Sequence, residues 1–269
     1  MDKYVNYELT EEQWKRIQPL LPPENTGKKG RPRKDERMML NGMLWLNHSG
    51  AQWRQLPECY GPWQSVYARF AKWRDDGIWK KIFTELSKDV DTENLSIDST
   101  CVKVHESSNG GEKAENKAVG RTKGGLNTKI HAMVDGLGNP VAFLLSPGND
   151  HDSTHAIELM RMTDITGCNL LGDMAYGTKE ILSYIQKHGA AAVIPPKSNT
   201  KEPWAVDYYL YKERHLVECF FQKMKWFRRV ATRSWKSIFG INIQDIQNIK
   251  QQSSVSCSFC LKIIIASAS

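Results

Sequence analysis

Four polar residues in the last third of the chain have a spacing that could bring their side chains to one face of a helix. Separations of 3, 4 and 7 residues join Tyr211, Arg214, Glu218 and Lys225. At about 100° of rotation per residue, these positions fall in one narrow stripe. Such a stripe is polar where a packed helix should be apolar. It is either a solvated face with an Arg214–Glu218 ion pair or one side of a functional site.

Two aspartates elsewhere in the chain could bring further carboxylates to that site. Asp98 closes the apolar segment LSID (95–98), and Asp173 closes NLLGD (169–173). We predict that both segments are strands that end at their acid. Either aspartate alone is explained as a turn former. Ligands of open α/β sheets, however, gather outside the carboxyl ends of strands, so the two aspartates and Glu218 could converge.

The segments around these acids predict a mixed α/β sheet flanked by helices. Apolar strands paired by a hairpin come first and then alternate with helices, an order typical of such a fold. The predicted strands cover 95–98, the hairpin 129–146, 169–173 and 191–194. The predicted helices cover 154–163, 178–188 and one long helix over 206–230. Residues 103–127 are Gly-rich and charged without periodicity, which predicts a long loop.

The first 88 residues predict a compact helical module. Helices are expected within 9–21, 38–46, 61–77 and 79–86, the first starting at a capping box of Thr10 and Gln13. We expect the tryptophans of this module to fill its core: Trp14, Trp45, Trp53, Trp63, Trp73 and Trp79. The chain is therefore divided into a helical domain (1–90), a sheet-containing domain (91–233) and an atypical tail (234–269).

Composition and charge narrow the classes of partner. The formal net charge is +7 at pH 7, which fits a polyanion such as nucleic acid, although many proteins carry such an excess. No apolar run is long enough to span a membrane, and the N-terminus lacks the apolar core of a signal peptide. We expect a cytoplasmic protein with reduced cysteines. Cys257 and Cys260 form a CxxC without the second ligand pair of a structural zinc site, so we interpret that spacing as chance.

The ordered motifs resemble those of a known enzyme family. Y211-x2-R214-x3-E218-x6-K225 resembles the signature of DDE insertion-sequence transposases of the insertion-sequence-four and -five groups. IDST (97–100), RTKGGLNTKIHAMVDGLGNP (121–140) and GDMAYG (172–177) resemble the stretches around the first two acids of that family. Residues 9–88 resemble the amino-terminal helical domain of insertion-sequence-five transposases. The resemblance covers roughly residues 8–233.

This resemblance implies a fold and a chemistry. The fold would be RNase H-like, preceded by a small all-α, helix-turn-helix-like domain. Asp98, Asp173 and Glu218 would be the catalytic residues and would hold two Mg²⁺ or Mn²⁺ ions, because three converging carboxylates repel one another unless cations intervene. The enzyme would hydrolyse phosphodiester bonds at the ends of its element and join the freed 3′-hydroxyl to target DNA.

The same resemblance implies partners and their contact residues. The partners would be the terminal inverted repeats of the element and target DNA, bound by a homodimer associated with the nucleoid. Predicted DNA contacts near the carboxylates are Tyr211, Arg214, Lys225, Arg228 and Arg229. In the helical domain they are Arg31, Arg33, Arg69 and Lys72. The alternatives are a solvated helix end, favoured there by the helix dipole, and a flexible basic loop.

Two segments fit the family less simply. Asp150, His151 and Asp152 suggest either a metal site or a polar turn before a helix, and we favour the turn. Residues 234–269 are Ser/Gln-rich where the family continues with an apolar helix, so we interpret them as frame-shifted or decayed sequence. The alternative function is therefore a catalytically inactive transposase remnant, or a derived protein that only binds DNA.

Overall fold

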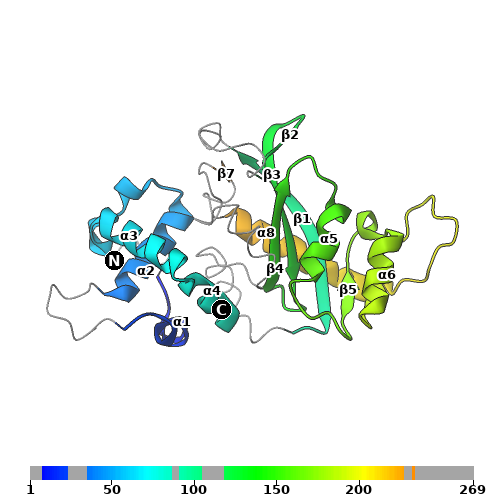
Figure 1. Cartoon of the computed structure of the whole chain (residues 1–269), viewed down its shortest axis with the longest axis horizontal. Coiled ribbons are helices and arrows are strands. Elements are labelled where there is room, and N and C mark those ends of the chain that lie inside the picture. The colour runs from blue at the N-terminus through cyan, green and yellow to red at the C-terminus, as the bar shows by residue number, and fades with distance from the viewer. Residues whose placement is uncertain (1–7, 24–34, 87–90, 105–117, 227–231, 234–269) are drawn as a thin grey trace.

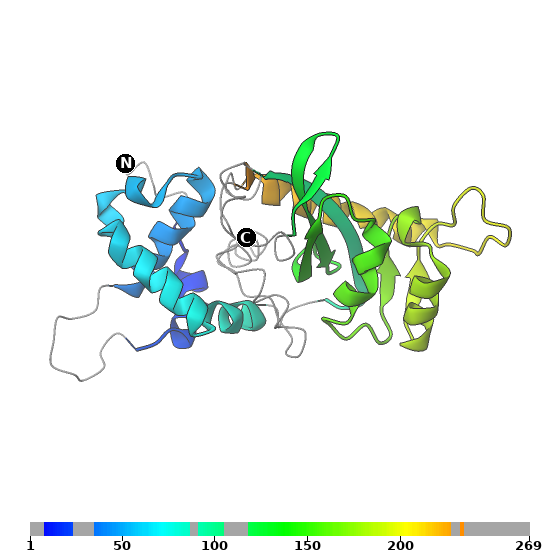
Figure 2. The same cartoon turned by 45° about the horizontal axis from the view of Figure 1, so that its top comes forward.

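The computed structural model describes residues 8–23, 35–86, 91–104, 118–226 and 232–233 (Figure 1). Helices occupy the first part of the chain, and a sheet with its covering helices occupies the second (Figures 1 and 2). The predicted tail, 234–269, lies outside the described residues, as do Cys257 and Cys260. Among the described residues, no helix is long and apolar enough to cross a membrane.

The described residues of the first part contain four α-helices: α1 (Glu11–Ile17), α2 (Glu36–Ser49), α3 (Trp63–Asp75) and α4 (Ile78–Leu86). The predicted capping box is confirmed, because Thr10 accepts from the Gln13 backbone and Gln13 reaches back to the Thr10 backbone. Trp14, Trp73 and Trp79 are buried, and the other three tryptophans pack against the same apolar cluster. The tryptophans therefore fill the core of this module, as the sequence predicts.

The sheet has the strand order of an RNase H-like fold. The strands are β1 (Asn94–Val104), β2 (Gly120–Thr122), β3 (Gly125–Val134), β4 (Pro140–Pro147), β5 (Asn169–Leu171), β6 (Ala191–Val193) and β7 (Thr232–Arg233). The hairpin β3–β4 continues antiparallel onto β1, and β5 and β6 then follow in parallel. The predicted mixed sheet of RNase H-like class is confirmed by this order.

Helices cover both faces of the sheet. On one face, α8 (His215–Lys225) packs its apolar side against residues such as Val102 and Phe143. On the other face, α5 (Asp152–Met160) and α6 (Lys179–Lys187) pack against residues such as Ile97 and Leu144. Successive strand residues point to opposite faces, so β1, β3 and β4 contribute side chains to both cores.

Three predicted elements differ from the structure. The strand predicted for 95–98 continues to Val104, because β3 pairs with it as far as Lys103. The loop predicted for 103–127 therefore contains the end of β1, all of β2 and the start of β3. The long helix predicted for 206–230 consists, in its described residues, of α7 (Tyr208–Tyr211), a 3₁₀ turn (Lys212–Arg214) and α8, and residues 227–230 lie outside the described residues. Asp207 caps α7, and the backbone stays right-handed through the turn, so the polar stripe survives.

Candidate active site

Asp98 lies in the middle of β1, not at its end as predicted. One edge of β1 is paired with β3 along Ser96–Lys103. Among the described residues, the other edge pairs with β5 along Asn94–Ser96 and with β7 along Lys103–Val104. Asp98 sits between these two short pairings, with 20% of its side chain exposed. Asp98 therefore lies just past the carboxyl end of β5, where no described strand pairs with this edge of β1. We call this gap in the pairing the opening next to β5.

Asp173 lies beside that opening, two residues beyond the end of β5. It caps a 3₁₀ turn (Met174–Tyr176), and its Oδ1 accepts a hydrogen bond from the Ala175 backbone at 2.8 Å. Its charge is close enough to Asp98 to raise the pKa of that carboxyl. The predicted strand is present but ends at Leu171, so Asp173 follows its carboxyl end and does not close it.

Arg214 joins Asp98 of the sheet to Glu218 of α8. Its Nη1 donates to Asp98 Oδ2 at 3.1 Å, and its Nη2 pairs closely with Glu218 Oε1. The guanidinium is 19% exposed, whereas the Glu218 side chain is 50% exposed. The Tyr211 ring centroid is 6.0 Å from the guanidinium carbon, within cation–π range. The predicted Arg214–Glu218 pair is thus present, and its third member is a carboxylate of the sheet.

Burial and neighbouring charges act against each other at these groups. Burial raises the pKa of Asp98, and Asp173 adds to this, while the Ser99 backbone amide and Arg214 oppose it without cancelling it. Burial alone would lower the pKa of Arg214, but Glu218 and Asp98 raise it overall. Arg214 therefore keeps its positive charge among these carboxylates.

The chemistry of these donors suits a hard divalent cation. Asp98, Asp173 and Glu218 offer only carboxylate oxygens, the ligands that Mg²⁺ and Mn²⁺ prefer. Within the described part of the chain, no three His, Cys, Asp or Glu side chains already stand close enough together to hold a metal. Arg214 contacts two of the three acids, so a cation would have to replace its contact with Asp98. The donor set fits such an ion once Arg214 moves.

Sequence reasoning missed other residues beside these acids. The buried Tyr176 is close enough to Asp98, Asp152 and Asp173 for all three charges to raise the pKa of its hydroxyl. Burial is the largest cause of that rise. Tyr176 belongs to the motif GDMAYG, so its position next to the second acid was the available signal.

The segment around Asp152 is the turn that the sequence favours. His151 is the N-cap of α5, and its side chain accepts from the Ser153 backbone. Asp152 opens the helix and bonds Ser99 of β1. No sequence pattern links Ser99 with Asp152, because the two residues lie far apart in the chain.

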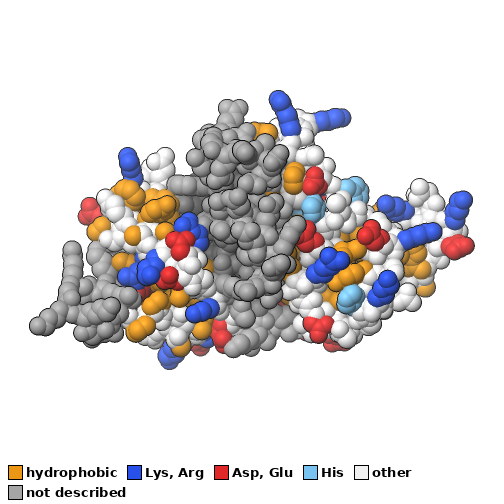
Figure 3. All heavy atoms as spheres, in the orientation of Figure 1, with side chains coloured by type: hydrophobic (Ala, Val, Ile, Leu, Met, Phe, Trp, Pro, Cys, Tyr) orange, Lys and Arg blue, Asp and Glu red, His pale blue; other side chains and the backbone are white. Residues whose placement is uncertain are grey.

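The predicted DNA contacts have different surroundings. Lys225 is exposed at the end of α8, and Lys72 is exposed on α3, 3.0 Å from Asp76. Arg69 instead pairs closely with the buried Glu36, and this ion pair joins α3 to α2 within the helical module. Arg31, Arg33, Arg228 and Arg229 lie outside the described residues. On the face seen in Figure 3, basic side chains are scattered among acidic ones over both parts of the molecule.

Among the solved structures that resemble this chain, two have low sequence identity to it. A chain of the piggyBac transposase synaptic complex with hairpin DNA has a TM-score of 0.48 and 10% identity, covering 99% of this chain and 78% of that chain. A chain of the pre-cleavage Mos1 transpososome has a TM-score of 0.28 and 13% identity, covering 95% of this chain and 86% of that chain.

Comparison with protein families and relatives is more specific. Residues 9–83 match a family described as putative transposases of the IS4/5 family, and residues 91–203 match the transposase DDE domain. The uncharacterized protein y4sN of Sinorhizobium fredii is 36% identical over 44% of this chain and 94% of its own length. The putative transposase for insertion sequence element IS6501 of Brucella ovis is 34% identical over 42% of this chain and 87% of its own length. The chain therefore belongs to the IS4/5 family of insertion-sequence transposases and carries a DDE transposase domain.

Proposed function

We propose that this transposase hydrolyses phosphodiester bonds at the ends of its own insertion sequence and joins the freed 3′-hydroxyl to target DNA. The main support is that Arg214 contacts both Asp98 and Glu218 at the opening next to β5. Asp173 lies close enough to raise the pKa of Asp98. These acids come from a strand, a loop and a helix far apart in sequence. Their meeting at one place supports a shared catalytic role.

Asp98, Asp173 and Glu218 are the proposed ligands of two Mg²⁺ or Mn²⁺ ions. Bound to these acids, such ions would supply electrophilic stabilisation to the attacking and leaving oxygens of the phosphodiester reaction. The half-buried carboxylates would concentrate negative charge where the ions bind. Because Asp98 is largely buried, less water would compete with a metal ion for its carboxylate oxygens.

Arg214 and Lys225 are the proposed phosphate contacts of the site. A guanidinium can grip a phosphate through two parallel hydrogen bonds, so Arg214 has a second partner available once it leaves Asp98. Tyr211 stacks against that guanidinium and would guide its movement. Lys225 is exposed at the end of α8, where it can approach the backbone of a bound duplex.

The proposed partners are the terminal inverted repeats and target DNA, held by a homodimer. The net charge of +7 favours association with a polyanion. Two ends must be held together for joining, which is why a dimer on DNA is part of the proposal. Association with the cytoplasmic nucleoid would follow from this function.

The test is a cleavage and joining assay with DNA carrying the ends of the insertion sequence. Purified protein with Mg²⁺ or Mn²⁺ should nick and join these ends, and Glu218→Gln should abolish both reactions. Glu180→Gln is the matched control, because Glu180 is an exposed acid on α6. Binding of the ends without nicking by the wild-type protein would overturn the proposal and identify a DNA-binding remnant instead.

A further inference from the structure

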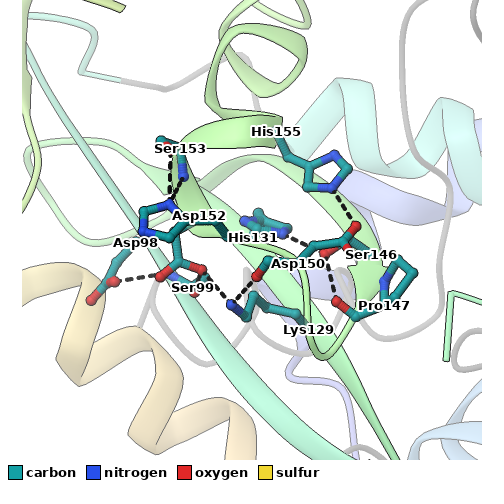
Figure 4. Close-up of polar contacts among 11 residues, drawn as sticks. Asp98, Ser99, Lys129, His131, Ser146, Pro147, Asp150, Asp152, Ser153 and His155 are labelled. Atoms are coloured by element: carbon teal, nitrogen blue, oxygen red, sulfur yellow. Dashed lines mark hydrogen bonds and ion pairs between the residues drawn. The ribbon is translucent and has the colours of Figure 1, made fainter. Parts of the chain in front are cut away.

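A cluster of polar side chains lies next to Asp98 but on the other face of β1 (Figure 4). We call Ser99, Lys129 and Asp152 the Asp152 cluster. They come from β1, β3 and the first turn of α5. Neighbouring strand residues point to opposite faces, so this cluster faces α5 whereas Asp98 faces α8. The proposed reaction uses none of the three side chains.

Ser99 connects this cluster to the candidate active site. Its backbone N–H donates to Asp98 Oδ1 at 2.7 Å, which fixes one oxygen of that carboxylate. Its hydroxyl donates to Asp152 Oδ1 at 2.6 Å. A single residue therefore holds Asp98 on one side of the strand and is held by Asp152 on the other.

Lys129 fixes Asp152 in turn. Its ammonium is 2.8 Å from Asp152 Oδ1 and donates to the Asp150 carbonyl at 2.6 Å. Only 12% of the Lys129 side chain is exposed, so this ion pair is shielded from solvent. Burial raises the pKa of Asp152, but the hydrogen bonds from Lys129 and Ser99 outweigh it, and the net pKa is lowered. Asp152 is thus a charged acceptor that keeps the Ser99 hydroxyl in one orientation.

Further hydrogen bonds support the cluster from behind. The buried His131 faces Ser146, with Nε2 2.8 Å from Oγ, and its ring lies 5.1 Å from that of His155. His155 Nε2 is 2.9 Å from Asp150 Oδ2. These contacts join β3, β4 and α5, so the N-terminus of α5 is held against the sheet beneath Ser99 (Figure 4).

We propose that Asp152 and Lys129 are positioning residues that fix Asp98 through Ser99. This inference rests on the proposed function, because it assumes that Asp98 holds a divalent cation. Asp152 and Lys129 would act on Asp98 through Ser99 without touching the substrate. Partners that orient a ligand from behind typically change metal affinity or activity by roughly 10- to 100-fold when they are removed.

The Ser99 hydroxyl gives the sharpest test. Ser99→Ala keeps the backbone bond to Asp98 but loses the hydroxyl's bonds to Asp152 and Tyr176, whereas Ser99→Thr keeps a hydroxyl. Ser99→Ala should weaken Mn²⁺ binding to the full-length protein by roughly tenfold or more, measured by calorimetric titration without DNA. Ser99→Thr should restore most of that affinity. Asp152→Asn should weaken binding as well, because it leaves Lys129 without its charged partner.

Controls separate positioning from folding and from the wider function. Ser153→Ala removes a partly exposed hydroxyl that bonds the His151 side chain in α5's first turn, and it should leave Mn²⁺ affinity unchanged. Equal Mn²⁺ affinity in wild type, Ser99→Ala and Asp152→Asn, with all proteins folded, would overturn the inference. So would equal weakening by Ser99→Ala and Ser99→Thr. A wild-type protein that binds Mn²⁺ but never cuts DNA would overturn the proposed function, and the Ser99 comparison would still decide the role of Asp152.

Discussion

The Arg214 guanidinium donates a hydrogen bond to Asp98 across 3.1 Å, from the start of α8 to the middle of β1. The same side chain pairs with Glu218 one helical turn further on. Two acids proposed as metal ligands are therefore paired with one cation of the protein itself. If these acids hold divalent ions as proposed, the ions and the guanidinium would compete for the same carboxylates.

This competition predicts the behaviour of Arg214→Gln. Without DNA, the variant should bind Mn²⁺ about tenfold more tightly than wild type, because a positive charge has been removed from the ligand set. Cleavage of element ends should nevertheless fall, because a proposed phosphate contact is lost. Calorimetry measures the first effect and a nicking assay the second. Arg161→Gln, at the exposed end of α5, is the control. Unchanged or weaker Mn²⁺ binding by Arg214→Gln would contradict the competition.

His131 predicts a pH dependence of stability. Burial and the neighbouring His155 lower the pKa of His131 from 6.5 to about 4. As the pH falls below 6.5, the unfolded chain takes up a proton that the folded chain refuses. Stability from the neutral ring is therefore present above pH 6.5 and is lost as the pH falls towards 4. The loss should amount to roughly 3 kcal/mol, at about 1.4 kcal/mol for each tenfold difference in proton affinity.

The measurement compares wild type with His131→Gln. Denaturant unfolding at pH 7 and at pH 4 gives the free energy of unfolding of each protein. The variant should lose less stability than wild type over this interval, because the Gln amide can face Ser146 but does not titrate. Equal losses in the two proteins would show that His131 does not carry this dependence.

Arg69 and Lys72 predict opposite outcomes on the same helix. Arg69→Met removes the guanidinium paired with the buried Glu36 and should cost about 3–5 kcal/mol of unfolding free energy. Lys72→Gln breaks only an exposed pair with Asp76 and should cost less than about 1 kcal/mol. Chemical unfolding measures both changes. An Arg69→Met protein as stable as wild type would show that the pair with Glu36 does not stabilise the helical module.

Lys225 predicts a change in the salt dependence of DNA binding. If it contacts one phosphate, Lys225→Gln should reduce the slope of log K against log salt concentration by about 0.9. Titrations of labelled element-end DNA at several salt concentrations give this slope. Lys187→Gln changes an exposed lysine of α6, on the other face of the sheet, and should leave the slope unaltered. Identical slopes for Lys225→Gln and wild type would exclude that contact.

The local part of the candidate site could be predicted from the sequence. The spacing of Tyr211, Arg214 and Glu218 follows helical geometry, and the 3₁₀ turn does not disturb it. Asp173 follows a short apolar strand, as its segment indicates. These features depend on residues close together in the chain, which is where periodicity is informative.

The long-range part could not be predicted in the same way. Asp98 was expected at a strand end because the apolar run stops there, but pairing with β3 extends β1 through polar residues. The bond between Ser99 and Asp152 and the pairing of Arg69 with Glu36 join different elements. Composition and spacing do not indicate contacts between distant elements. The sequence alone therefore could not show that Arg69 pairs with a buried carboxylate.

The division into domains at about residue 90 stays a prediction. Helices precede that point and the sheet follows it, yet one apolar cluster includes residues from both parts. The boundary was inferred from a change in periodicity, which reports local structure and not whether two cores are separate.

Single-turnover cleavage of element-end DNA by Asp98→Asn, Asp173→Asn and Glu218→Gln tests the central claim most directly. If the three acids serve one site, each variant should lose cleavage by at least about a thousandfold while keeping its affinity for the ends and its thermal stability. Effects within one catalytic unit are non-additive, so the Asp98→Asn/Asp173→Asn double variant should be no worse than either single variant. Cleavage within tenfold of wild type by any one of the three, or multiplied losses in the double variant, would contradict a single site built from these acids.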